Sequence, residues 1–240
     1  DAAGFTTSGA NATVMGTLTL SGPTGGIGRS GAGTFILDNY AGGASKTLNI
    51  IGGGRTELAL VGVPAAGTKF AISGGSTLAG TGATPLGGST VVQLGGGTLE
   101  LLGAPVDMTS LTTTVVALPA IPAIPVGPGV PVEIPEVPSA PSASTLTTDT
   151  DPNFGALSFE GDGLVTTAGA STGITFTQTS VAAGVTGGVV ADNQAVHVGP
   201  VTVADGGVFV GGTAGTGALN YSSLSLSAVS GGVGGVAGHT

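Results

Sequence analysis

Residues 31–61 contain one short pattern three times, in the sequence GAGTFILDNYAGGASKTLNIIGGGRTELALV. Each copy begins with glycines, continues with a threonine and a short alternating apolar run, and ends at glycine again. The runs start at Thr34, Thr47 and Thr56. Apolar residues at a period of two are typical of half-buried strands, and glycine clusters allow sharp corners. Strands and corners repeated at short spacing predict that the chain coils into a β-solenoid.

Similar runs on both sides of this segment predict that residues 1–118 form one all-β, solenoid-like domain. No apolar run has the 3.6-residue period and caps of a helix, and glycine and threonine are poor helix formers. The spacing between strand starts is uneven, which indicates a degenerate repeat. The expected strands are 13–15, 17–20, 34–37, 47–51, 56–61, 69–72, 90–94, 98–102 and 111–118.

The composition limits both the fold and the chemistry. Glycine accounts for 48 of the 240 residues, and only 7% of residues are charged. The surface must therefore consist largely of Thr, Ser, Asn and Gly, and it lacks the charges that usually prevent sheet edges from associating. The chain has no cysteine, which excludes disulfides and thiolate-bound zinc.

The net charge of −9 is unevenly distributed. The basic residues are Arg29, Lys46, Arg55 and Lys69, and only three acids lie in the same segment of the chain. The other ten acids follow Lys69, with no Lys or Arg among them. This distribution argues against nucleic acid as a partner, because nucleic acid requires clustered basic residues. It favours head-to-tail contact between copies, although an acidic exported protein without such contacts has the same property.

Residues 31–50 follow the pattern Gly-x-Gly-Thr-apolar-x-Leu-x-Asn-Tyr-x-Gly-Gly-x-x-x-Thr-Leu-x-Ile, with the Asn-Tyr pair at Asn39 and Tyr40. Residues 15–22 and 95–101 repeat its strand portion. These segments resemble the autotransporter-associated β-strand repeat of bacterial surface proteins, mainly over residues 1–118. The resemblance implies a right-handed parallel β-helix at the cell surface with a structural or adhesive role.

Residues 119–141 contain eight prolines, mostly at every third position. This period matches the three residues per turn of polyproline II and predicts an extended arm or linker over residues 119–148. The residues between the prolines are largely apolar, so we expect the arm to be buried against its own domain or a neighbouring copy. An ordinary stiff linker is the alternative. Residues 115–132 have the length of a membrane helix, but their prolines forbid one, and no transmembrane segment is expected.

Residues 149–240 are predicted to form a second all-β domain, which either continues the solenoid or forms a β-sandwich. Asp162-Gly163 and Asp205-Gly206 are predicted to be hairpin turns, because Asp-Gly supplies the positive φ that tight turns need. The expected strands are 156–159, 163–166, 174–177, 189–190, 195–198, 201–203, 208–210 and 221–229.

The sequence shows no catalytic constellation. His197 lies in an alternating strand and His239 in a glycine-rich tail, and neither has Ser and Asp partners at a recognisable spacing. No phosphate-binding loop or nucleophile elbow occurs. We therefore expect no enzymatic activity and no required cofactor.

One metal pattern occurs after the arm. Asp149, Asp151 and Asn153 place oxygen ligands at alternate positions, and Glu160 falls at the twelfth position, as in a calcium loop. Phe154 stands where such loops have glycine. The pattern predicts calcium binding at these four residues, and the alternative is an Asp-rich turn whose side chains bond their own backbone.

These features predict a structural subunit of an extracellular bacterial filament, sheath or surface layer, located outside the cell or on its surface. Copies would self-assemble head-to-tail into a homopolymer through sheet edges and the proline-rich arm. The start at Asp1, without methionine, suits a mature exported protein or a chain cut for another reason. The alternative is a surface adhesin or carbohydrate-binding passenger domain that recognises surface glycans, with Tyr40 and Tyr221 as its available aromatic residues.

Overall fold

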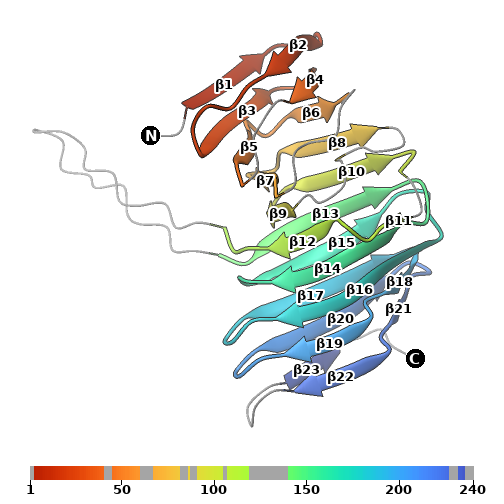
Figure 1. The fold of residues 1–240 in the computed structure, drawn as a ribbon. Coiled ribbons are helices and arrows are strands. Elements are labelled where there is room, and N and C mark those ends of the chain that lie inside the picture. The colour runs from red at the N-terminus through yellow and green to blue at the C-terminus, as the bar shows by residue number, and fades with distance from the viewer. Residues whose placement is uncertain are drawn as a thin grey trace, which may run out of the picture.

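The structure is a computed structural model, and it describes residues 3–40, 45–59, 67–81, 86, 91–104, 107–118, 140–226 and 232–235. Every regular element in these residues is a β-strand, which confirms the predicted all-β class. The strands form a thirteen-stranded sheet A and a ten-stranded sheet B, and the described part of the chain contains no helix suited to crossing a membrane. Neighbouring strands within each sheet are parallel, so the chain is a β-solenoid (Figure 1).

The strands of the two sheets have the following bounds. Sheet A contains β1 (Ala3–Ser8), β3 (Thr24–Ser30), β5 (Thr47–Ile51), β7 (Lys69–Ser73), β9 (Val91–Gly95), β11 (Asp107–Met108), β12 (Thr112–Val115), β14 (Asn153–Phe159), β16 (Gly173–Val181), β18 (Ala195–His197), β19 (Pro200–Val203), β21 (Ala218–Asn220) and β22 (Ser223–Leu226). Sheet B contains β2 (Thr13–Leu18), β4 (Thr34–Tyr40), β6 (Arg55–Leu58), β8 (Thr77–Thr81), β10 (Thr98–Leu102), β13 (Ser142–Thr148), β15 (Gly163–Ala168), β17 (Thr186–Asp192), β20 (Val208–Ala214) and β23 (Gly232–Gly235).

At most corners the chain moves from one sheet to the other, so that a turn of the solenoid contributes to both sheets. Phe5 pairs with Ile27 in the next turn, and Ile27 pairs with Ile50 in the turn after that. One turn of the solenoid is therefore the stretch of chain between two residues that pair. Strand starts are unevenly spaced along the sequence, but in these turns the spacing between a strand and its partner in the same sheet is regular. The solenoid therefore has a regular period.

The core consists of columns of apolar side chains stacked along the solenoid axis. One column passes through sheet A from β1 to β22 without interruption, and its eight inner members are at most 2% exposed. Burying such side chains between turns is the main driving force for this fold. The column comprises Phe5, Ile27, Ile50, Ile72, Leu94, Val115, Phe159, Val181, Val203 and Leu226.

The strand ladder continues across the predicted proline-rich arm. β12 pairs with β9 before it and with β14 after it, and β10 pairs with β13. Residues 119–139 lie outside the described residues, whereas residues 142–148, also assigned to the arm, form β13. The amide of Leu118 donates a hydrogen bond to the carbonyl of Ala140 at 2.9 Å, so the chain leaves and re-enters the solenoid at one point. Of the two alternatives for the second half, the solenoid continuation is confirmed.

The two predicted hairpins are wrong. Asp205-Gly206 joins β19 to β20, but β19 pairs with β16 and β22 in sheet A, while β20 pairs with β17 and β23 in sheet B. Asp162-Gly163 likewise connects β14 in sheet A to β15 in sheet B. Gly206 has the expected positive φ of 67°. Gly163 does not have a positive φ, so the predicted turn conformation is confirmed only at Gly206. Both Asp-Gly pairs make corners between sheets, since stacking from turn to turn determines which strands pair.

Glycine allows close contact between successive turns at several positions. A Cβ on Gly28 in β3 would overlap the backbone carbonyl of Ile51 in the next turn. Gly16 in β2 is different, because a Cβ there would have no atom within 4 Å. Neither residue has a positive φ, so the two sites differ in space rather than in backbone conformation.

Gly28→Ala is expected to lower the free energy of unfolding by about 1–3 kcal/mol or more, because the new methyl group forces two turns apart. Gly16→Ala, the matched control, should change it by less than about 0.5 kcal/mol. Urea unfolding followed by circular dichroism measures both. Equal stabilities of the two variants would contradict the close packing of β3 against β5.

Candidate functional site

The four residues of the predicted calcium loop do not converge. Asp149 and Asp151 lie at the corner between β13 and β14, and Asn153 is the first residue of β14. Glu160 follows the last residue of the same strand. An extended strand rises about 3.3 Å per residue, which separates Glu160 from Asn153 by roughly 20 Å. The structure therefore brings three of the predicted residues to one corner and leaves Glu160 at the other end of β14.

The two aspartates of this corner bind the backbone of neighbouring turns. Asp149 Oδ1 accepts a hydrogen bond from the Gly103 amide at 2.7 Å. Asp151 Oδ1 accepts from the amides of Thr172 at 2.6 Å and Gly173 at 3.0 Å, and its Oδ2 accepts from the Thr172 hydroxyl at 2.7 Å. The Thr172 hydroxyl, followed by the Gly173 and Thr172 amides, holds the pKa of the Asp151 carboxyl below its ordinary value. These side chains thus connect one turn to the next.

No group of three or more His, Cys, Asp or Glu side chains is arranged to hold a metal within the ranges that the structure describes. Calcium binding by this chain stays a prediction. His197 lies at the end of β18 with its side chain exposed, and His239 lies outside the described residues.

The two tyrosines considered for a carbohydrate groove differ in accessibility. Tyr40 is 5% exposed and packs against Phe70, with ring centroids 6.0 Å apart, and its burial raises the pKa of its hydroxyl. Tyr221 is 59% exposed, between β21 and β22. Of these two residues, Tyr221 is available to a ligand.

Three of the four basic residues are engaged in contacts within the chain, and Lys46 donates hydrogen bonds to the carbonyls of Leu20 and Ser21. Arg29 is 1% exposed and donates hydrogen bonds to the Thr13 hydroxyl at 2.9 Å and the Gly9 carbonyl at 2.6 Å, so it fixes the corner between β1 and β2. Arg55 lies on the outer face of sheet B and pairs with Glu57 at 2.9 Å and with Glu100 at 3.1 Å. These contacts reduce the positive charge that is free to meet a ligand.

The apolar columns end in exposed side chains at both ends of the solenoid. Phe5 in the first turn is 47% exposed, and Leu224 and Leu226 in the last strand of sheet A are 43% and 46% exposed. Their column neighbours Ile27 and Val203 are 1% and 0% exposed. Within the described residues, no further turn packs against Phe5 or Leu226, whereas the buried members of the column have a turn on each side. Repeat proteins usually close such ends with polar capping repeats.

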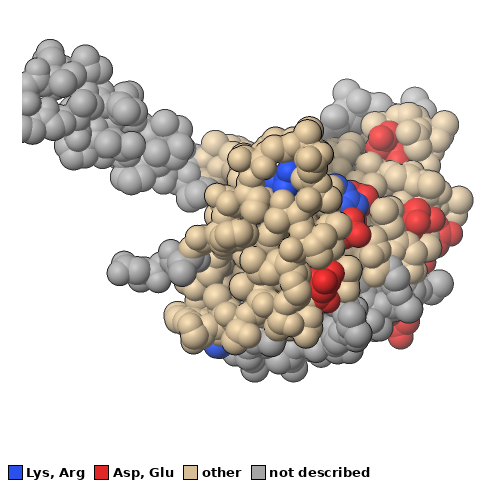
Figure 2. All heavy atoms as spheres, turned by 90° about the horizontal axis from the view of Figure 1, so that it is seen from above, with Lys and Arg blue, Asp and Glu red and all other residues tan. Residues whose placement is uncertain are grey.

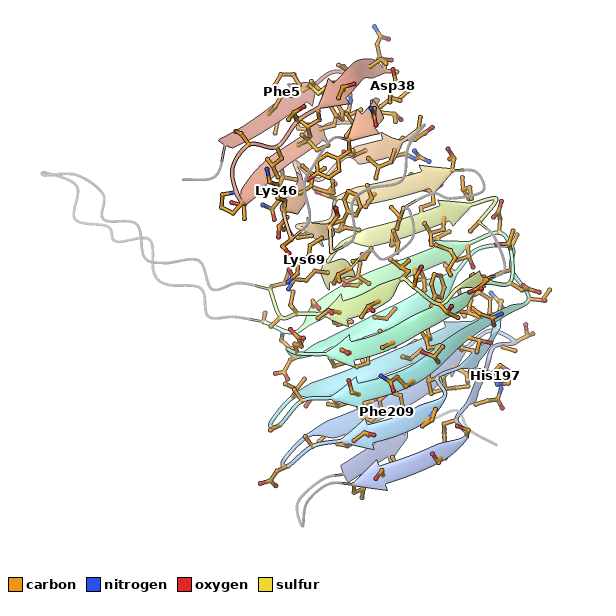
Figure 3. The ribbon with its side chains drawn as sticks, in the orientation of Figure 1. Phe5, Asp38, Lys46, Lys69, His197 and Phe209 are labelled. Atoms are coloured by element: carbon orange, nitrogen blue, oxygen red, sulfur yellow. The ribbon has the colours of Figure 1, made fainter. Side chains whose placement is uncertain are left out.

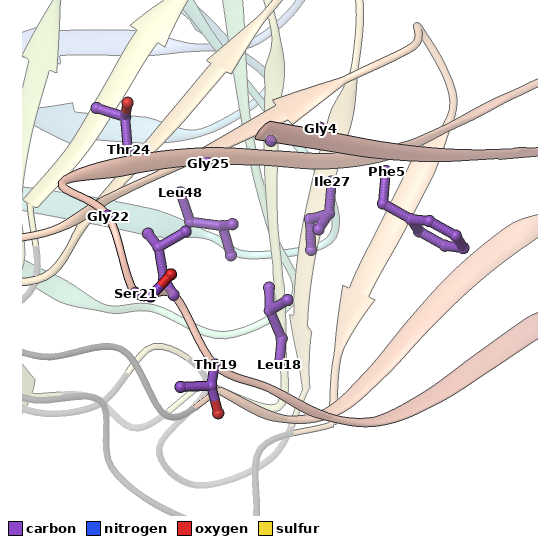
Figure 4. Close-up of a pocket in the computed structure, with 12 residues that line it drawn as sticks. Gly4, Phe5, Leu18, Thr19, Ser21, Gly22, Thr24, Gly25, Ile27 and Leu48 are labelled. Carbon is purple, nitrogen blue, oxygen red and sulfur yellow. The ribbon is translucent and has the colours of Figure 1, made fainter. Parts of the chain in front are cut away.

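The N-terminal end contains an apolar hollow of about 330 Å³ between β1, β3 and the segment that follows β2 (Figure 4). Phe5, Leu18, Ile27 and Leu48 line it. Gly25 pairs with Leu48 and so occupies the same column, but it has no side chain to fill the space. The hollow is therefore an unfilled position of the core at the end of the stack.

The surface around this end has few charges. Seen from above the view of Figure 1, Lys and Arg form a few small patches, Asp and Glu form several more along one side, and most of the described surface in view is uncharged (Figure 2). An uncharged end with exposed apolar side chains favours association with another apolar surface.

Comparison of the chain with models of protein families, with curated proteins and with solved structures finds no match. The β-solenoid predicted from the autotransporter-associated repeat is present, while membership of that family stays a prediction.

Asp151→Asn is expected to destabilise the protein at neutral pH and to have a smaller effect in acid. A carboxyl with a lowered pKa in the folded state contributes stability above its unfolded pKa of about 3.9, and this contribution is lost as the pH falls through the folded value. Urea unfolding between pH 7 and pH 2.5 measures the difference. Glu160→Gln is the control, and a pH-independent effect of Asp151→Asn would contradict the proposed contacts.

Proposed function

We propose that the chain is a structural subunit that assembles head-to-tail with copies of itself into an extracellular filament, sheath or surface layer. The observation that supports this function is the column from Phe5 to Leu226, whose two ends are exposed apolar side chains in the same column of the core. A second copy stacked on the end would bury both residues, as the inner turns bury theirs. The extracellular setting rests on the sequence resemblance and the composition.

The backbone at the two ends of the described solenoid also has unpaired strand edges. β1 pairs only with β3, and β23 pairs only with β20, so each end presents a strand edge without a partner in the described part of the chain. Exposed edges of this kind are templates for pairing with another chain. Since the pairs of each sheet are parallel, head-to-tail stacking continues the ladder in the same direction. A contact between two different surfaces that does not close produces a filament.

The charges favour the head-to-tail orientation. No basic residue follows Lys69 in the sequence, and Lys46 and Lys69 lie on the N-terminal half of the solenoid (Figure 3). The described residues of the last turns, from Thr186 onward, carry acids such as Asp192 and no Lys or Arg. Unlike charges guide orientation and association rate more than affinity. The predicted role of the proline-rich arm in assembly depends on residues 119–139, which lie outside the described residues.

Phe5→Asp and Leu226→Asp are each expected to abolish polymers, because a carboxylate buried at the stacked interface would have no partner. Val14→Asp is the matched control: Val14 is 62% exposed at the same end, but it lies between Thr13 and Met15, which pair with the buried Phe35 and Leu37, and so it faces outward. Electron microscopy and sedimentation, in calcium and in a chelator, measure assembly.

A mixture of the two variants separates the possible orientations. Phe5→Asp protein retains an intact C-terminal end, and Leu226→Asp protein retains an intact N-terminal end. Head-to-tail stacking predicts that each variant alone is monomeric and that the mixture forms dimers that grow no further. Monomeric wild-type protein at high concentration, or dimers of a single variant, would count against the proposal.

A further inference from the structure

A row of polar residues follows the outer face of sheet A through four successive turns. Asn153 pairs with Thr175, Thr175 with His197, and His197 with Asn220. Strands in a sheet are about 4.8 Å apart, so the four side chains recur at that interval. Figure 3 shows His197 on the outside of the sheet, away from Lys46 and Lys69. This face therefore presents amide, hydroxyl and imidazole groups at regular spacing.

The polar groups of this row are available for a ligand. Asp149 and Asp151 use their carboxylates to connect turns, whereas the side chains of Asn153, Thr175, His197 and Asn220 make no hydrogen bond within the described part of the chain. His197 and Asn220 are exposed, and Asn153 and Thr175 are half-buried. Together they offer both donors and acceptors.

A break in the strands produces a groove along this row. β16 pairs with β18 up to Thr175 and with β19 from Thr179 onward, and the chain bends between them at Gly199. Gly199 has a φ of 65°, and a Cβ there would lie 2.7 Å from the carbonyl oxygen of Thr177. The bend leaves a hollow of about 470 Å³, defined here as the His197 groove. Its polar and proline lining comprises Thr175, Thr177, His197, Pro200, Asn220 and Ser222.

We propose that the His197 groove binds a neutral oligosaccharide. A saccharide offers many hydroxyls that donate and accept hydrogen bonds, and the groove provides unpaired groups of both kinds in consecutive turns. Tyr221 does not line the groove, but it lies between the lining residues Asn220 and Ser222 and is 59% exposed, so its ring is an aromatic surface next to the groove for the apolar face of a sugar ring. The side chains of the row recur at about 4.8 Å, which is similar to the length of one pyranose unit. A linear oligosaccharide that lies along the row would therefore place one sugar unit at each turn.

The chemistry of the lining excludes the other common ligands. Lys and Arg are absent after Lys69, so the groove offers a polyanion no permanent positive charge. His197 is the one usual metal ligand in the lining, so a metal ion would lack a second side-chain donor of that strength. A neutral, hydroxyl-rich ligand is the class that fits.

The test uses the full chain and a panel of immobilised linear oligomers of glucose, mannose, galactose, xylose and N-acetylglucosamine, followed by calorimetry with the tightest-binding hexasaccharide. His197→Ala and Asn220→Ala should each weaken binding roughly threefold to tenfold, the loss expected for one hydrogen bond. Tyr221→Ala should weaken it at least as much. Thr166→Ala, which removes an outward hydroxyl from β15 in sheet B, is the matched control and should leave binding unchanged.

Absence of binding to every oligomer of the panel would overturn the proposal, and so would equal binding by the three groove variants and the control. Sulfated and uronate oligomers are added to the panel as anionic competitors, and preference for them over the neutral oligomers would also overturn the proposal. Phe5→Asp should bind the oligosaccharide as the wild type does, and His197→Ala should still form polymers. The two assays therefore distinguish failure of the groove from failure of the assembly.

Discussion

Stacking of like side chains from one turn to the next is the interaction on which the whole molecule depends. A turn as short as the stretch from Phe5 to Ile27 cannot enclose a core, so its inward side chains are buried only by adjacent turns. Hydrogen bonds between parallel strands, which also run along the solenoid axis, satisfy the backbone N–H and C=O groups of each turn. Both contributions require an adjacent turn. Among the described residues the first and last turns each have an adjacent turn on one side only, which explains why Phe5 and Leu226 are exposed although their column neighbours are buried.

The corners keep successive turns in register. Their polar side chains bond to the turn on either side, as Asp151 does with Thr172. Inside the solenoid, some buried hydroxyl and amide groups pair with each other, and the hydroxyls of Thr148 and Ser171 are 2.7 Å apart. Gln194 of the next turn donates to Ser171 at 2.5 Å. Such contacts satisfy buried polar groups that would otherwise weaken the fold, so a chain with few charges still specifies its register.

The sequence allowed the strands to be predicted but not their partners. The bounds of β5 and β10 were predicted correctly, because an initial threonine followed by alternating apolar and polar residues is a strong local signal. β3, with the sequence TGGIGRS, was missed, because its glycines hide the alternation. The regular period of the turns was missed because strands pair two elements apart and because residues 119–139 interrupt the count. The groove and the exposed ends depend on register, and no local pattern reports which residues from different turns become neighbours.

The hydrogen bond between Leu118 and Ala140 has a consequence for any assembly of these subunits. The chain leaves the coil at Leu118 and returns at Ala140, and the turns before and after this point pair with each other directly. We therefore expect this position to accept an inserted sequence of another length or chemistry. Ten strands in sheet B at about 4.8 Å each give one subunit a length of about 48 Å along the axis. A stack of copies would display an inserted peptide at that fixed interval, which makes the position suited to arranging a chosen epitope or enzyme in a regular row.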